Sequence, residues 1–101
     1  MKPKNGMRPI HPGEILQEEF LKPLGMSARK LADAIRVPSN RVSAIVAGDR
    51  EVTPDTALRL SRAFDTSPEF WLNLQQTHDL RVAEETAELD DVKRVIVAKK
   101  A

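Results

Sequence analysis

The feature that most constrains the fold is a pair of short amphipathic segments joined by very few residues. Each segment repeats its apolar residues at the three- and four-residue intervals of an α-helix buried on one side. These residues are Leu31, Ala32 and Ile35 in residues 26–35, and Val42, Ile45 and Val46 in residues 37–50. The connection "RVPS" leaves too little chain for an antiparallel hairpin. The sequence therefore predicts two helices that cross steeply, with the small Ala32 allowing close approach and Val37 filling the angle between them.

Helix start and stop signals lie on both sides of this pair. Pro12 opens a segment with an apolar stripe, which Pro23 and Gly25 end. The stripe consists of Ile15, Leu16, Phe20 and Leu21. Ser27, Thr53 and Ser67 are suited to the N-cap position, and prolines follow the last two at the first helical residue. No strand pattern occurs before residue 90, so the sequence predicts an all-α fold of five helices with a longer C-terminal helix.

Length and composition favour a single domain in a reducing compartment. The chain has 101 residues, of which 41% are hydrophobic and none is cysteine. We predict an N-terminal arm at 1–11, a helical domain at 12–89 with the crossed pair at about 27–47, and a C-terminal tail at 90–101. The tail fits either a frayed helix or a short extended segment that pairs with something else. Without a signal peptide or a membrane-length apolar run, we expect a cytoplasmic protein with no membrane partner.

The outer face of the second helix of the pair carries short side chains and no carboxylate. It consists of Ser39, Asn40, Arg41, Ser43 and Ala44, and no Asp or Glu occurs between residues 34 and 48. Such a face can approach base edges in the DNA major groove, where Asn40 suits adenine and Arg41 suits guanine or a phosphate. Candidate phosphate contacts around it are Ser27, Arg29, Lys30 and Arg50. The pair is thus predicted to be a DNA-binding helix-turn-helix, with a helical bundle that lacks a DNA role as the alternative.

Charge is distributed unevenly along the chain. Residues 1–50 hold nine Lys/Arg against five Asp/Glu, and residues 51–101 hold seven against ten. This asymmetry suggests a polyanion and a basic protein as partners, although solvated helix faces explain it equally well. The candidate faces for a basic protein are Glu14, Glu18 and Glu19 in the first helix and Glu84, Glu85 and Glu88 in the last.

The start of the last helix is unusually apolar. Phe70, Trp71, Leu72 and Leu74 crowd more than one face of it, which is more than a small core readily buries. We predict a homodimer contact at these residues, with a wholly intramolecular core as the alternative. Such a dimer would place two recognition helices about 34 Å apart, one turn of DNA.

Catalytic and metal-binding patterns are not recognisable. His11 and His78 each lack a second histidine at i+3 or i+4, so a helix-end or interface role is favoured over metal ligation. No serine, histidine and acid are placed as a nucleophilic site requires. We expect neither a metal, nor a cofactor, nor an enzyme.

Residues 27–64 resemble the Cro/CI-type (XRE) helix-turn-helix family nearly throughout. The flanking stretches "IHPGEILQEEFLKPLGMS" (10–27) and "VTPDTALRLSRAFDTSPEFWLNLQQTHDL" (52–80) are similar to one branch, the HigA antitoxins of HigBA toxin–antitoxin modules. The resemblance implies a lambda-repressor-like domain that forms a homodimer, binds palindromic operator DNA and represses its own operon. It also implies a partner toxin, a small basic HigB-like ribonuclease of the RelE family, for which the two glutamate faces above are alternative docking faces.

Two other functions remain open, and the sequence departs from the family pattern at one position. A stand-alone Cro/CI-type repressor without a toxin and an inhibitor that no longer binds DNA are the competing functions. Many relatives have glycine in the turn where this chain has Arg36. If the position is left-handed, a side chain there costs on the order of 1 kcal/mol.

Overall fold

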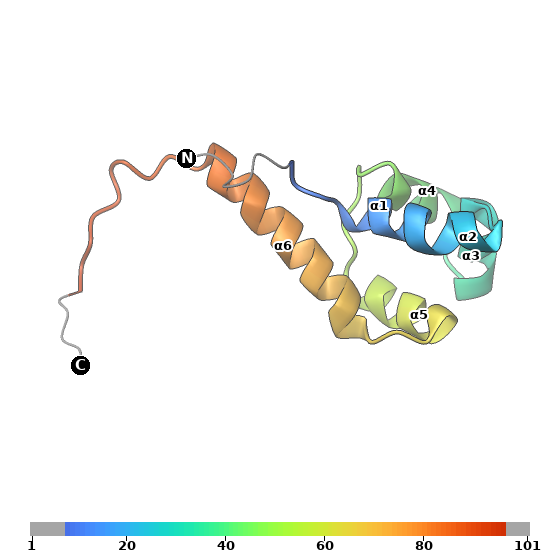
Figure 1. The fold of residues 1–101 in the computed structure, drawn as a ribbon. Helices are drawn as coiled ribbons and strands as arrows, with labels where there is room; N and C mark the ends of the chain where they lie inside the picture. The colour runs from blue at the N-terminus through green and yellow to red at the C-terminus, as the bar shows by residue number, and fades with distance from the viewer. Residues whose placement is uncertain (1–7, 97–101) are drawn as a thin grey trace.

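The computed structural model describes residues 8–96, which contain five helices and no strand (Figure 1). The first helix is a continuous run over residues 12–24, made of α1 (Pro12–Ile15), a π-helical segment η1 (Leu16–Leu21) and α2 (Lys22–Leu24). It is followed by α3 (Ala28–Ile35), α4 (Ser39–Val46), α5 (Pro54–Phe64) and α6 (Pro68–Thr86). The predicted all-α, five-helix architecture is confirmed.

Side chains cap the helix starts as the sequence predicts. The Ser27 hydroxyl accepts the Lys30 backbone N–H at 3.0 Å, and the Ser67 hydroxyl accepts that of Phe70 at 3.1 Å. Thr53 caps α5 in the same way. Each bond satisfies one of the donors that the first turn of a helix leaves free, so the helix boundaries follow from local chemistry.

Helix ends share a second device, a left-handed residue that redirects the chain. Gly25, Gly48, Arg36 and Asp65 all have positive φ, and the residue after each donates its N–H to a carbonyl five residues back. This is the Schellman arrangement, which favours glycine because a Cβ is strained there. Arg36, with φ 64° and ψ 48°, occupies such a position without being glycine. Arg36 therefore adopts the left-handed conformation in which a side chain is strained, although many relatives have glycine there.

The π-helical segment in the first helix explains its apolar pattern. Leu16 and Leu21 are both buried although they lie five residues apart, which in an α-helix would separate them by about 140°. The Lys22 N–H bonds to the Gln17 carbonyl, a five-residue interval that widens the turn. This widening brings both leucines to the core side and was not anticipated from the sequence.

The core lies between the first helix, the α3–α4 pair and α5. In the α3–α4 pair, the apolar residues predicted to face inward are at most 5% exposed, except for Val46, which is half-buried. Val37 packs against this core. Gly13 fixes the spacing between α1 and α4: a Cβ on it would lie 1.7 Å from the Ile45 carbonyl oxygen. Only a residue without a side chain permits this contact between the two backbones.

Trp71 corrects the predicted dimer contact. Its side chain is completely buried within the protomer, where its ring lies against Phe20, Phe64 and Phe70, and its indole N–H donates to the Thr66 hydroxyl at 2.8 Å. Including Trp71 in an interface between copies was therefore wrong, because the first helix and α5 supply aromatic partners that enclose it.

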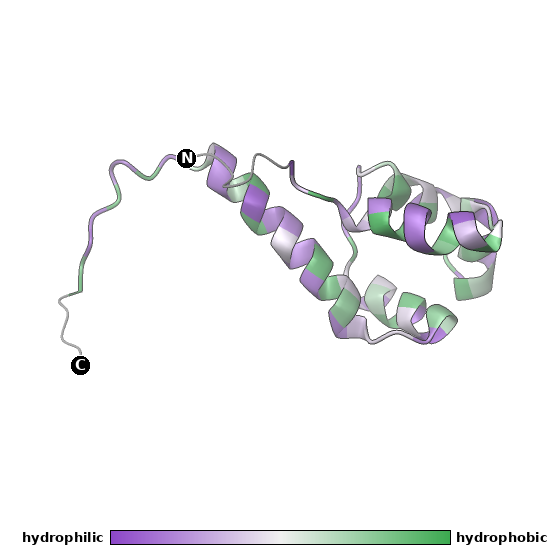
Figure 2. Cartoon of the chain, in the orientation of Figure 1, coloured by the Kyte–Doolittle hydropathy of each residue, from purple (hydrophilic) through white to green (hydrophobic). Residues whose placement is uncertain are grey.

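Beyond the core, the second half of α6 projects away from the other helices (Figure 1). Hydrophilic and hydrophobic residues are mixed along it, without one continuous apolar face (Figure 2). Residues 87–96 continue as non-helical chain with exposed side chains, so the frayed-helix alternative does not apply to them. Residues 1–7 of the predicted arm and 97–101 of the predicted tail lie outside the described residues. No described helix is both long and apolar enough to cross a membrane.

Candidate nucleic-acid interface

The α3–α4 pair presents the short side chains of α4 on the side opposite the core. Ser39, Asn40 and Ser43 are exposed and Ala44 is half-buried, whereas Val42 and Ile45 are 1% exposed. The Ser43 hydroxyl also turns back toward its own helix, 3.3 Å from the Asn40 carbonyl. The face therefore has polar groups close to the helix backbone, which a major groove can accept.

The start of α4 differs from the other helix starts. Pro38 occupies its N-cap position, and no side chain in the described part of the chain accepts a hydrogen bond from the first turn. Its first N–H groups therefore remain available to water or to an anionic oxygen. They lie beside Ser39 and Asn40, so donors from the main chain and from side chains converge at one end of the exposed face.

Arg41 departs from the predicted exposed face. Its side chain is only 27% exposed, and its Nη1 lies 3.7 Å from Asp55 Oδ2 in α5. Its Nε is buried and has no hydrogen-bond acceptor among residues 8–96. The guanidinium is therefore turned toward α5. The prediction that Arg41 stands out with Asn40 is wrong, because α5 begins with a carboxylate within its reach.

The predicted phosphate contacts lie around this face. Ser27, Arg29 and Lys30 are exposed at the start of α3, where a shallow hollow of about 590 Å³ also includes Met26. Arg50 is exposed in the loop between α4 and α5. The four residues are thus on the surface at the two ends of the pair, where cations and N–H groups suit phosphate oxygens.

The loop that carries Arg50 is held by residues of α6. The buried side chain of Gln75 accepts the Val52 N–H at 2.7 Å and donates to Asp79 at 2.9 Å. Sequence reasoning missed Gln75, because a glutamine in a helix gives no signal of burial. This bond ties the segment after α4 to α6, so the position of the loop depends on both helices.

His11 joins the same region as the N-cap of α1. Its Nδ1 accepts the Gly13 N–H at 2.8 Å, which confirms a helix-end role. Burial lowers the pKa of His11, and the nearby His78, whose ring centre is 5.0 Å away, lowers that pKa further. A hydrogen bond to the Arg50 backbone and the charges of Asp79 and Asp49 act in the opposite direction and raise it, but the pKa remains below its usual value. A neutral His11 fits this site, because Nδ1 must carry a lone pair to accept from Gly13. Among the described residues, no group of three or more potential ligands could hold a metal ion.

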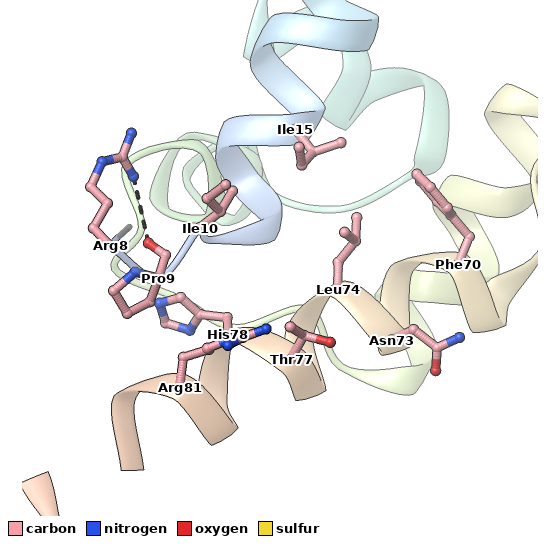
Figure 3. A pocket seen from close by; sticks show the side chains of 10 residues that line it. All are labelled: Arg8, Pro9, Ile10, Ile15, Phe70, Asn73, Leu74, Thr77, His78 and Arg81. Carbon is pink, nitrogen blue, oxygen red and sulfur yellow. Dashed lines mark hydrogen bonds between the residues drawn. The ribbon is translucent and has the colours of Figure 1, made fainter. Parts of the chain in front are cut away.

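A groove separates the N-terminal segment from α6 (Figure 3). It has a volume of about 400 Å³ and an apolar lining that includes Ile10, Ile15, Phe70 and Leu74. Phe70 is 38% exposed, whereas Leu72 and Leu74 are half-buried against the core. Of the predicted dimer residues, Phe70 and Leu74 therefore contribute to an accessible apolar surface.

The two predicted glutamate faces differ in their pairing. Arg8 donates twice to the Glu14 carboxylate, at 2.8 and 2.9 Å, and this hydrogen bonding lowers the pKa of Glu14. Glu18 pairs with Lys22 at 3.1 Å. Glu19 and the carboxylates at 84, 85 and 88 are exposed, and none of these forms a salt bridge with another residue between 8 and 96.

Comparisons with known proteins agree with this geometry. A family model described as helix-turn-helix matches residues 18–71. Virulence-associated protein I of Dichelobacter nodosus is 52% identical over 82 residues, which cover 81% of this chain and 76% of that protein. Antitoxin HigA-1 of Vibrio cholerae is 42% identical over 77 residues, covering 76% and 72%. The solved structure of antitoxin GraA in complex with its operator is 50% identical, covers 95% of this chain and all of that one, and superposes with a TM-score of 0.84.

Proposed function

Because the chain belongs to the helix-turn-helix family, and within it to the HigA-type antitoxins, we propose that it binds palindromic DNA at its own promoter, represses its operon there and neutralises a ribonuclease toxin. The exposed face of α4 carries the DNA part of this proposal. It combines short polar side chains and uncapped N–H groups on a helix whose other side is fixed in the core. The function is one of binding in the cytoplasm and assigns no catalytic step.

The proposed contacts fall into two classes. Ser39, Asn40, Ser43 and Ala44 face the bases, where the Asn40 amide can both accept from and donate to adenine. Ser27, Arg29, Lys30 and Arg50 contact phosphates and fix the register of α4 in the groove. Arg41 is a conditional contact, since it is held toward Asp55 in the free protein.

Gel shift and footprinting on the DNA upstream of the gene test this assignment. The Asn40→Ala variant is expected to lose about 1–3 kcal/mol of operator affinity and to relax base preference at one position in each half-site. The matched control, Arg29→Ala, should weaken binding to all sequences and reduce the salt slope by about 0.9. Equal binding of operator and scrambled DNA by the unaltered protein would rule out the specific repressor.

For the toxin, we propose that the docking face consists of the end of α6 and the first residues after it. Glu84, Glu85 and Glu88 keep their charge unpaired within the described part of the chain, whereas Glu14 and Glu18 are partly neutralised by Arg8 and Lys22. Leu80 and Leu89 add exposed apolar surface at 58% and 65%. A basic partner would meet both long-range attraction and apolar contact there.

Association kinetics with the small basic protein encoded beside the gene distinguish the two glutamate faces. Changing Glu84 and Glu85 of α6 and Glu88 just after it to lysine should slow association and flatten its dependence on ionic strength. The control variant changes Glu18 and Glu19 in the first helix and should have a smaller effect. If the α6 variant associates at the original rate, docking lies elsewhere.

We further propose that the protein acts as a homodimer, with Phe70 and Leu74 in the contact. Their groove is accessible and apolar, and pairing two α4 helices doubles the contacts to a palindrome. Sedimentation of the full chain should give a dimer that Phe70→Asp converts to a monomer. Leu58→Asp, on α5 and at 58% more exposed to solvent than Phe70 at 38%, serves as the control. A dimer that survives Phe70→Asp and dissociates with Leu58→Asp would move the contact to α5.

A further inference from the structure

One carboxylate joins the three helices that surround the turn of the helix-turn-helix. Asp55, in the first turn of α5, accepts a hydrogen bond from Arg59 Nε at 2.9 Å and lies 3.7 Å from Arg41 Nη1. Arg59 in turn donates from Nη1 to the Ile35 carbonyl at 2.8 Å, at the end of α3. Arg59 thus binds the turn before α4, and the Asp55 carboxylate contacts the guanidinium groups of both Arg59 and Arg41.

The state of Arg41 shows what this carboxylate does. Asn40 and Ser43, its neighbours on α4, are exposed, yet the Arg41 side chain is 27% exposed and its enclosed Nε has no acceptor among the residues that the structure describes. An enclosed donor without a partner is unfavourable, so the attraction of Asp55 must contribute to keeping the side chain there. Without Asp55, two arginines of equal charge would be left beside each other, and the longer-range repulsion would favour an outward Arg41.

We propose that Asp55 is a specificity-determining positioning residue that holds Arg41 back from the DNA-facing surface of α4. Discrimination among sequences then comes from the short side chains, which contact bases only when the fit is correct. A released arginine would instead find a phosphate on any DNA, because that contact carries no sequence information. This inference rests on the proposed DNA-binding function and adds to it a residue that does not itself touch DNA.

The attraction between Asp55 and Arg41 is modest, so its loss should appear as a change in the ratio of operator affinity to scrambled-DNA affinity. Asp55 and Arg41 are both partly exposed, and pairs of this kind shift equilibria by about two- to fivefold. Asp55→Asn should therefore tighten binding to scrambled DNA by about that factor and steepen the salt dependence by about 0.9, the slope for one added phosphate contact. Operator affinity should rise less, so the ratio of operator to scrambled affinity falls.

A double-mutant cycle separates release of Arg41 from simple loss of a negative charge. Fluorescence anisotropy is measured on an operator duplex and on a scrambled duplex of equal length and composition, for Asp55→Asn, Arg41→Met and the double variant of the full chain. In the Arg41→Met background, Asp55→Asn should have no more effect than the control Asp33→Asn, which removes an exposed carboxylate of α3 that forms no described salt bridge. Asp55→Glu should keep the discrimination of the original protein.

The outcomes are distinct. An Asp55→Asn effect that persists at full size without Arg41 overturns the proposal, as does an unchanged affinity ratio. Arg41→Met provides a second test that does not alter the Asp55–Arg59 pair: operator affinity should stay within about twofold, since the side chain is held back. A tenfold loss would mean that Arg41 contacts DNA in the unaltered protein, and it would overturn the proposal. If the unaltered protein itself does not discriminate between the duplexes, the proposed function fails, and this inference, which rests on it, is overturned with it.

Discussion

The α3–α4 pair and the second half of α6 are constructed in contrasting ways. In the pair, Leu31, Ala32, Val42 and Ile45 are at most 1% exposed, and the turn is held by backbone bonds and by Arg59 from α5. In α6, every residue from Asp79 to the helix end at Thr86 is exposed. One region has its geometry fixed by packing on several sides, and the other is a single helix surrounded by solvent.

The two regions meet different requirements, one for reading DNA sequence and one for attracting a charged partner. A helix that reads base edges must hold its side chains in place before DNA arrives, because ordering them on binding lowers affinity. A charged surface that attracts a partner needs no such packing, because attraction over several ångströms tolerates motion. The core therefore stabilises the proposed DNA-binding end, and the projecting half of α6 is left free to carry charge.

The largest loss of stability is expected from adding a methyl group where α1 contacts α4, because it would disturb the tightly packed region and not the projecting half of α6. Gly13→Ala places a Cβ 1.7 Å from the Ile45 carbonyl oxygen, so the two backbones must separate. We expect a loss of about 3 kcal/mol or more in the free energy of unfolding, measured by urea denaturation, since overpacking of this severity lies at the upper end of such effects. Gly25→Ala is the matched control: its φ is +60° but nothing lies within 4 Å, so it should lose only about 1–2 kcal/mol. Equal losses in both variants would contradict the close approach.

The turn of the pair allows a gain in stability. Arg36 has φ 64°, so Arg36→Gly should relieve strain worth about 1 kcal/mol. Glycine also increases the entropy of the unfolded chain, so the net gain in the free energy of unfolding is expected to be only a few tenths of a kcal/mol. Arg36→Ala keeps the strained backbone and removes only the guanidinium, and it should show no gain. A destabilised glycine variant would mean that the Arg36 side chain contributes more than its backbone costs.

The junction between the two regions should respond to pH through His11. Burial lowers its pKa in the folded protein below the unfolded value, so folding favours the neutral ring. This contribution is complete above the unfolded pKa and is lost as pH falls through it toward the folded pKa. Thermal melting temperatures should therefore drop between pH 7.5 and 5.5, and His11→Asn, which keeps a capping side chain, should flatten the drop. His78→Gln removes the neighbouring ring but leaves His11 half-buried against the rest of the protein, and most of the drop should remain.

The features that the sequence predicts correctly are those that depend on residues close together along the chain. Ser27 and Ser67 act as caps because the bonds they form lie within three residues, and the inward faces of α3 and α4 follow from helical spacing. Trp71 and Arg41 were placed wrongly because their environments come from other helices, namely Phe20 and Asp55. The π-helical segment did leave a signal, since Leu16 and Leu21 share a side only in a widened turn.

The smallest effect on stability is expected at the exposed end of α6. Glu84, Glu85 and Glu88 are exposed, and they form no salt bridge within residues 8–96. They also lie near the C-terminal end of a helix dipole, where negative charge is slightly unfavourable. Changing all three to glutamine should therefore leave the free energy of unfolding unchanged or raise it by a few tenths of a kcal/mol, as measured by urea denaturation at low salt. Glu14→Gln, which removes the partner of Arg8, is the control and should not share the gain. A marked loss of stability in the triple variant would show that this half of α6 has packing partners within the protomer, and the contrast between the two regions would no longer hold.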